Sequence, residues 1–99
     1  MTPKFPLGKT CATPPALEAM AAHGINPSDL IRRHVSGDWG CVGEEDRQTN
    51  DANVIHDERL LPAYPIDASK PCEGFGSNTL WVITERDRSV TTILLPSDY

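Results

Sequence analysis

Residues 80–96, LWVITERDRSVTTILLP, form the longest apolar and β-branched run in the chain and constrain its fold more than any other feature. A short charged break from Glu85 to Arg88 divides the run into two segments that favour β-strands. The pattern predicts a β-hairpin whose tip is the charged break. Apolar residues occur at odd and even positions of both segments, so both faces of the hairpin are apolar. We therefore expect these two strands to lie at the centre of a sheet.

Two short helices are predicted ahead of the hairpin, because each has a start and a stop signal. Thr13 followed by two prolines is a typical N-cap, and Gly24 can end the helix by adopting a positive φ angle. Asn26 followed by proline repeats the start signal, and Gly37 ends the second helix. Helices this short depend on packing against the sheet for their stability. The side chains expected to pack are Leu17, Met20 and Ala21 in the first helix and Leu30, Ile31, His34 and Val35 in the second.

A third helix is predicted from Glu44 to about His56, since three acidic residues in its first turn complement the helix dipole. Its apolar stripe is weak, so we expect it to be the most exposed helix. Residues 59–66 are predicted to form a strand with Leu60, Tyr64 and Ile66 on one side and Leu61 and Ala63 on the other, but two prolines restrict this segment to the edge of a sheet. Residues 1–12 are interpreted as a loose arm that leads into a short extended segment at a sheet edge.

These elements predict a single domain of residues 1–99 in the α+β class. We expect a mainly antiparallel sheet of three or four strands, with two or three helices packed on one face. A chain of 99 residues has the size of one domain and can bury one modest core.

The formal net charge of −5 is concentrated in the middle of the chain, where Arg47 is the only basic residue between residues 38 and 58. This acidity disfavours direct binding to nucleic acid, whose phosphates need lysine and arginine, and it suits a protein partner with a basic surface. The simpler interpretation is a solvated helix face. The candidate binding residues are Asp38, Glu44, Glu45, Asp46, Asp51, Asp57 and Glu58, together with Arg86 and Arg88 at the hairpin tip.

The three cysteines, Cys11, Cys41 and Cys72, are far apart and form no CxxC motif. The N-terminus lacks the apolar segment of a signal peptide, so we expect a cytoplasmic chain with reduced thiols. No apolar run approaches the roughly 20 residues of a membrane-spanning helix. The cysteine and histidine spacings fit no known metal site, and no cofactor is expected.

His34 is the best catalytic candidate, because it lies at a predicted helix end beside Arg32 and Arg33. An imidazole there could act as an acid or a base on a phosphate held by the arginines, with Ser89 or Thr91 of the hairpin nearby. The alternative is structural: a helix-end histidine near the last carbonyls, and hydroxyls that pair across strands. No glycine-rich phosphate loop, HExxH or GxSxG motif is present.

Four segments of the chain carry a family resemblance: RRHVSGDWG, EEDRQTND, LLPAY and, above all, LWVITERDRSVTTILLPSDY. On these segments the chain resembles a family of small bacterial proteins found on plasmids, phages and genomic islands. The resemblance extends from about Leu7 to Tyr99, and this chain departs from it by a longer loop at Asp67–Asn78. It implies a mobile-element setting and transfers no catalytic residue.

The leading hypothesis is a small acidic accessory protein of mobile elements that acts by binding a protein partner rather than by catalysis. The expected partner is a host nucleic-acid-handling or defence complex such as CRISPR, which the chain would inhibit. The alternative is a ribonuclease toxin, similar at fold level to RelE and barnase, that uses His34 with Arg33, Ser89 and Thr91. A DNA-binding regulator would need a more basic helix than the second one. The sequence leaves open a homodimer in which a copy covers the sheet.

Overall fold

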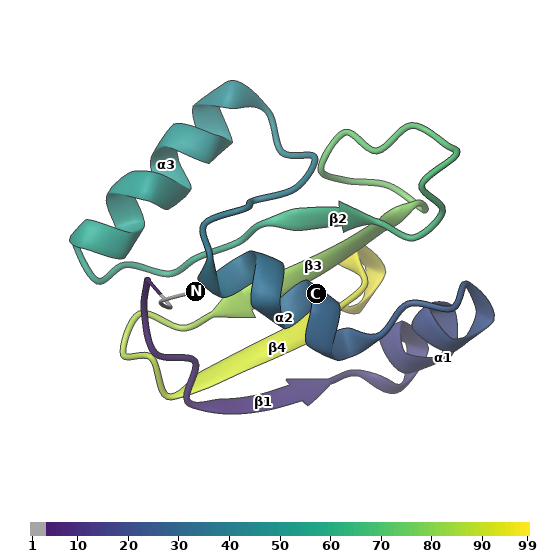
Figure 1. The fold of residues 1–99 in the computed structure, drawn as a ribbon, viewed down its shortest axis with the longest axis horizontal. Coiled ribbons are helices and arrows are strands. Elements are labelled where there is room, and N and C mark those ends of the chain that lie inside the picture. Colours follow the sequence, from purple (N-terminus) through teal and green to yellow (C-terminus); the bar gives the residue numbers. More distant parts are fainter. Residues whose placement is uncertain (1–3) are drawn as a thin grey trace.

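The computed structural model describes residues 4–99. Within these residues it confirms an α+β fold with three helices and a four-stranded, mostly antiparallel sheet (Figure 1). The apolar run at the end of the chain forms the two central strands, as its composition predicts. In chain order the elements are β1 (Lys9–Ala12), α1 (Pro14–Ala22), α2 (Pro27–Val35), α3 (Glu44–Ile55), β2 (Ala63–Pro65), β3 (Thr79–Thr84), β4 (Val90–Leu94) and the 3₁₀ turn η1 (Pro96–Asp98).

The strand order across the sheet is β1-β4-β3-β2. The hairpin pairs Val82 with Ile93, and β2 pairs antiparallel with β3 at one edge, as the prolines of residues 59–66 predict. At the other edge β1 runs parallel to β4, with Thr10 opposite Thr91. This parallel pair joins the first strand to the last. All the other helices and strands lie between these two in the chain, so no local sequence signal indicates that β1 runs parallel to β4.

The local capping signals predict the starts of the two short helices correctly. The Thr13 hydroxyl accepts a hydrogen bond from the Ala16 N–H at 3.3 Å, and the Asn26 side chain accepts one from the Ser28 N–H at 2.9 Å. Gly24, just after α1, has φ of +66°, a conformation in which glycine carries no steric cost. The bonds accepted by Thr13 and Asn26 satisfy N–H donors that the first turn of a helix otherwise leaves without partners.

The main core lies between one face of the sheet and the helices α1 and α2. In Figure 1, α2 crosses in front of the sheet, and α1 lies beyond the end of β1. The helix α3 does not join this layer; it lies beside the β2 edge (Figure 1). A second cluster under α3 contains Phe5, Trp39 and Leu60. The buried members of the main cluster are Ala16, Met20, Leu30, Tyr64, Leu80, Val82 and Ile93.

The predicted buried face of α1 is rotated in the structure. Ala16 and Met20 are buried, whereas Leu17 is 49% exposed. Residues 16 and 20 are one turn apart and form the row that faces β4, and residue 17 is turned by about 100° from that row. The alanine-rich sequence gives this helix little directional preference, so packing against the sheet decides which row is buried.

The second face of the sheet is covered in part by the end of the chain. The ring of Tyr99 meets Trp81 of β3 edge to face, with the ring centroids 5.8 Å apart. The Trp81 indole donates to the Gly74 carbonyl at 2.8 Å, and the Arg59 guanidinium lies 5.2 Å from the Tyr99 ring centroid. These contacts leave Trp81 half-buried. None of the helices in residues 4–99 is long and apolar enough to cross a membrane.

We expect Leu80→Ala and Leu17→Ala to have very different effects on stability. Leu80 is fully buried, so its truncation should lower the free energy of unfolding by about 3 kcal/mol through lost burial and a cavity. The half-exposed Leu17 should cost about 0.5 kcal/mol or less. Urea unfolding of both variants measures this difference, and equal losses would contradict the observed rotation of α1.

Candidate functional site

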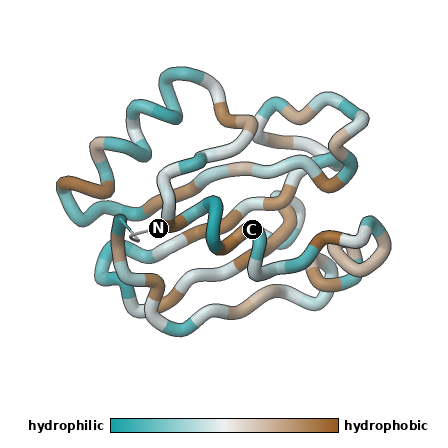
Figure 2. The backbone as a smooth tube through the Cα atoms, in the orientation of Figure 1, coloured by the Kyte–Doolittle hydropathy of each residue, from teal (hydrophilic) through white to brown (hydrophobic). Residues whose placement is uncertain are grey.

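The helix α3 is held to the rest of the chain mainly by polar side chains. Asn50, in the middle of the helix, accepts from the Leu61 N–H at 3.0 Å and donates to the Leu61 carbonyl at 3.3 Å. Its amide therefore pairs with the backbone ahead of β2 as a neighbouring strand would. Asp51 accepts from the Trp39 indole at 2.8 Å, and Val54 packs on the second core cluster. Most other side chains of α3 are exposed, as predicted. Figure 2 shows that most residues of this helix are hydrophilic.

A disulfide between Cys41 and Cys72 joins the segment before α3 to the loop at residues 67–78. The expectation of three reduced thiols is therefore wrong for these two residues, and only Cys11 is free and exposed. The bond spans 31 positions, a separation that gives no pairing signal in the sequence. Disulfides persist in oxidising compartments, so this bond weighs against a reducing environment, and the cytoplasmic localisation stays a prediction.

The predicted acidic residues fall into three groups. Asp38 and Asp51 serve internal contacts: Asp38 accepts from the Arg33 side chain at 2.7 Å, which holds the pKa of its carboxyl below the usual value. Glu44 pairs with Arg47 along α3, and Glu58 lies 3.5 Å from Arg86. The remaining three form no ion pair within residues 4–99, and they are Glu45, Asp46 and Asp57.

The two arginines of the hairpin tip differ in role. Arg86 is exposed and faces Glu58. Arg88 donates to the carbonyls of Asn53 at 3.1 Å and of Glu58 at 2.7 Å, where α3 ends. Its guanidinium thus satisfies carbonyls at the helix C-terminus, where a positive charge is favourable. Arg88 fastens α3 to the hairpin and is not free to bind a partner through these donors.

His34 is fully buried and lies in a chain of hydrogen bonds through the core. Its Nε2 is 2.6 Å from the Thr84 hydroxyl, Thr84 is 2.8 Å from the Thr91 hydroxyl, and Thr91 donates to the Leu7 carbonyl at 2.8 Å. Because Thr91 donates outward, Thr84 donates to Thr91 and the Nε2–H of His34 donates to Thr84. Nδ1 is then a bare acceptor, and it has no hydrogen-bond partner.

Aromatic rings enclose this imidazole. Phe5 meets it edge to face with the ring centroids 4.9 Å apart, and Trp39 does so at 6.0 Å. Burial, with a smaller contribution from the positive charge of Arg88, lowers the pKa of His34 to about 3. The imidazole is therefore neutral at physiological pH, and its side chain is fully buried.

The other predicted catalytic residues are not gathered around His34. Ser89 is exposed and donates to Asp87 at 2.6 Å, while Arg33 pairs with Asp38 and lies 4.7 Å from the Tyr64 ring centroid. Only Thr91 is linked to His34, through Thr84, and it is buried as well. This geometry favours the structural interpretation of His34 over the catalytic one.

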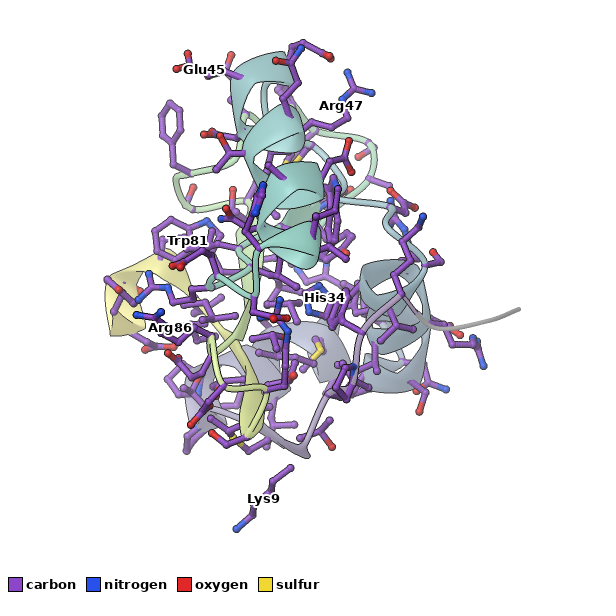
Figure 3. The ribbon with its side chains drawn as sticks, turned by 90° about the vertical axis from the view of Figure 1, so that its left-hand side faces the viewer. Lys9, His34, Glu45, Arg47, Trp81 and Arg86 are labelled. Carbon is purple, nitrogen blue, oxygen red and sulfur yellow. A yellow bond between two sulfur atoms is a disulfide. The ribbon has the colours of Figure 1, made fainter. Side chains whose placement is uncertain are left out.

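A groove of about 450 Å³ lies between α3 and the loop at residues 67–78. Its apolar lining includes Leu61 and Trp81, and Phe75 also lines it with 66% of its surface exposed. In Figure 3, Glu45 and Arg47 project from the outer end of α3, and Trp81 and Arg86 lie on the side away from α2. The further lining residues are Val42, Asp46, Thr49, Asn50, Asn53, Arg59 and Gly74.

Several members of this site were missed by the sequence interpretation. Phe75 lies between two glycines of the loop at residues 67–78, and its exposure depends on how that loop is fastened. Asn50 has a polar amide at an inward position of a helix, and that is the signal that could have identified it. No group of three or more His, Cys, Asp or Glu side chains within residues 4–99 is placed to hold a metal ion.

Comparison of the chain with protein-family models, with curated proteins and with solved structures gives no match.

The state of the cysteines gives a direct prediction. Thiol titration of the denatured but unreduced chain should detect Cys11 alone. Reduction of the Cys41–Cys72 bond should lower the free energy of unfolding by about 3 to 4 kcal/mol, because the unfolded chain regains the entropy of a 31-residue loop. Cys11→Ser is the control and should leave stability unchanged. Detection of three thiols would show that the bond does not form.

The buried histidine predicts a specific dependence of stability on pH. The unfolded chain binds a proton at His34 near pH 6.5, whereas the folded chain binds it only near pH 3. Stability contributed by this group is therefore complete above about pH 6.5 and falls by about 1.4 kcal/mol per pH unit below it. We expect wild type to lose about 2 to 3 kcal/mol more than His34→Gln between about pH 6.5 and pH 4.5 in urea unfolding. Equal losses would contradict a buried neutral imidazole.

Proposed function

We propose that this chain is a protein-binding module that docks its partner through the α3 surface, defined by Glu45, Asp46, Thr49 and Phe75 around the groove above Trp81. The observation that carries the proposal is the exposed ring of Phe75 in the lining of a groove that also contains Leu61, Trp81 and the carboxylate of Asp46, which forms no ion pair within residues 4–99. Aromatic anchors beside a pocket typically contribute most of the energy of a protein interface.

The loop that presents Phe75 is held in place before any partner arrives. Cys72 is tied to the segment ahead of α3, and the Phe75 carbonyl accepts from the Thr79 hydroxyl at 2.8 Å. The Asn78 amide donates to the carbonyls of Asp67 and Pro71 at 3.1 Å each. A loop fixed in this way loses little conformational entropy on binding, which favours affinity.

The charges around the groove specify the chemistry of the partner. Glu45 and Asp46 lie in the first turn of α3, and both are exposed and form no ion pair within the described residues. They would accept charge-assisted hydrogen bonds from lysine or arginine, and the net charge of −5 would attract a basic surface from a distance. The favoured partner thus presents basic residues around an apolar side chain that enters the groove.

Proteins that handle nucleic acids carry such basic surfaces, because they bind phosphates. Together with the resemblance to mobile-element proteins, this supports an accessory protein that occupies the nucleic-acid-binding surface of a host complex and inhibits it. A defence complex such as CRISPR is the partner that we propose to test first. The ribonuclease alternative gains no support from the buried His34 and is not proposed.

The test compares wild type with a charge reversal and an aromatic truncation. We expect Glu45→Lys, and separately Phe75→Ala, to weaken binding to a purified CRISPR effector complex by about tenfold or more. Glu18→Lys, which places the same single charge reversal on the exposed side of α1, is the matched control and should bind as wild type. Affinities from surface plasmon resonance at two salt concentrations measure this, and wild-type binding should weaken as salt rises.

Two results would contradict the proposal at different levels. Binding that is equal in all four proteins would show that the α3 surface is not the docking site. No binding of wild type to effector complexes would remove this class of partner. The α3 surface would then be tested by affinity capture from bacterial extracts with the same variants, where loss of the captured protein in both variants but not in the control is expected.

A further inference from the structure

One edge of the sheet is covered by another segment of the chain, and the other edge is uncovered within residues 4–99. At the β2 edge, the segment ahead of α3 covers the strand: the Cys41 N–H donates to the Ala63 carbonyl at 2.8 Å, and the Ala63 N–H donates to the Trp39 carbonyl at 3.2 Å. At the other edge, β1 has no neighbour beyond it within residues 4–99 (Figure 1). An uncovered edge strand is a template for another strand.

The register of β1 on β4 defines which backbone groups are free. The N–H of Lys9 donates to Ser89 at 3.0 Å, and the N–H of Thr13 donates to Ile93 at 2.9 Å. Backbone groups alternate in direction along a strand, so those of Thr10 and Ala12 point away from the sheet. The edge therefore offers two N–H donors and two carbonyl acceptors, and they are placed symmetrically about residue 11.

We propose that a second copy of this chain pairs antiparallel with β1 about a two-fold axis at Cys11. In this register Thr10 lies opposite Ala12 of the copy, and Ala12 lies opposite Thr10 of the copy. Each pair exchanges two N–H···O=C bonds, so every free group of both edges is satisfied. The two sheets then form one continuous sheet of eight strands.

Neighbouring registers do not achieve this. An axis at Thr10 would place Ala12 opposite Gly8 of the copy, outside the strand, and an axis between two residues would set outward groups against inward ones.

A two-fold axis perpendicular to the sheet also places both copies of α2 on one side. Beside the edge, Asp29 and Arg32 of α2 are paired with each other, so the adjoining surfaces carry balanced charge.

Cys11 serves as a reporter of this register. It is exposed and would face Cys11 of the copy as a non-hydrogen-bonded pair, with the Cα atoms about 4.5 Å apart. That separation lies within the range of disulfide geometry. Lys9 lies on the same face of the strand, but it would face Thr13 of the copy and not its own equivalent.

The interface is small, so we expect a weak dimer, with a Kd on the order of 100 µM. Sedimentation of Cys11→Ser measures this without oxidation. Thr10→Pro removes one outward N–H from each copy at an edge position that tolerates proline, and it should weaken dimerisation by at least about tenfold. Thr10→Val keeps that N–H and is the matched control, which should behave as Cys11→Ser alone. All three proteins carry the serine.

Cross-linking with diamide tests the register on an intact backbone. Two Cys11 thiols give up two electrons and two protons to the diazene, which becomes the hydrazine, and a disulfide joins the copies. Wild type should cross-link at least about tenfold faster than Cys11→Ser combined with Lys9→Cys. A chain that stays monomeric near about 1 mM, a dimer that survives in folded Thr10→Pro, or equal cross-linking of the two thiol positions would overturn the proposal.

Salt separates this inference from the proposed function. Two copies with a net charge of −5 repel each other, so added salt should strengthen the dimer. Binding of a basic partner to the α3 surface should weaken under the same change. A dimer that dissociates as salt rises would contradict backbone pairing between two acidic copies, and it would leave the α3 surface untouched.

Discussion

The chain of hydrogen bonds from His34 through Thr84 and Thr91 to the Leu7 carbonyl is the interaction on which the rest of the structure depends. It joins α2, both central strands and the N-terminal arm at one buried point. A buried polar group without a partner costs about 1 to 3 kcal/mol, so each of these four segments is restricted to the arrangement that completes the chain. A slip of one residue between the central strands would turn the threonine of the slipped strand to the other face and break its bond to the second threonine.

This arrangement explains why the most obvious candidates for chemistry have structural roles. His34, Thr84 and Thr91 lie inside the core, where their polar atoms define the register of strands and helix. Arg88 is likewise used to close the end of α3. The α3 surface and the β1 edge, in contrast, carry groups that make no contact inside the fold. Our two proposals therefore concern these exposed features. The α3 surface offers side-chain contacts, and the β1 edge offers backbone hydrogen bonds.

Much of the fold could be predicted because its signals are local. The hairpin, the caps at Thr13 and Asn26 and the start of α3 each depend on a few neighbouring residues. The rest depends on contacts between distant segments: the parallel pairing of β1, the Cys41–Cys72 bond and the exposure of Leu17. The acidic character of α3 was evident from composition, whereas the groove beneath it required the loop and Trp81 to be placed together.

The central claim is that a rigid hairpin scaffold presents α3 and its neighbouring loop to a partner protein. Hydrogen exchange measured on the chain alone and in complex tests this claim most directly, because it locates the contact without any substitution. We predict that binding slows exchange in residues 44–50 and 72–76 and leaves the hairpin tip at residues 85–88 unchanged. Protection confined to the tip, or to the end of α2 at Arg32 and Arg33, would contradict the claim.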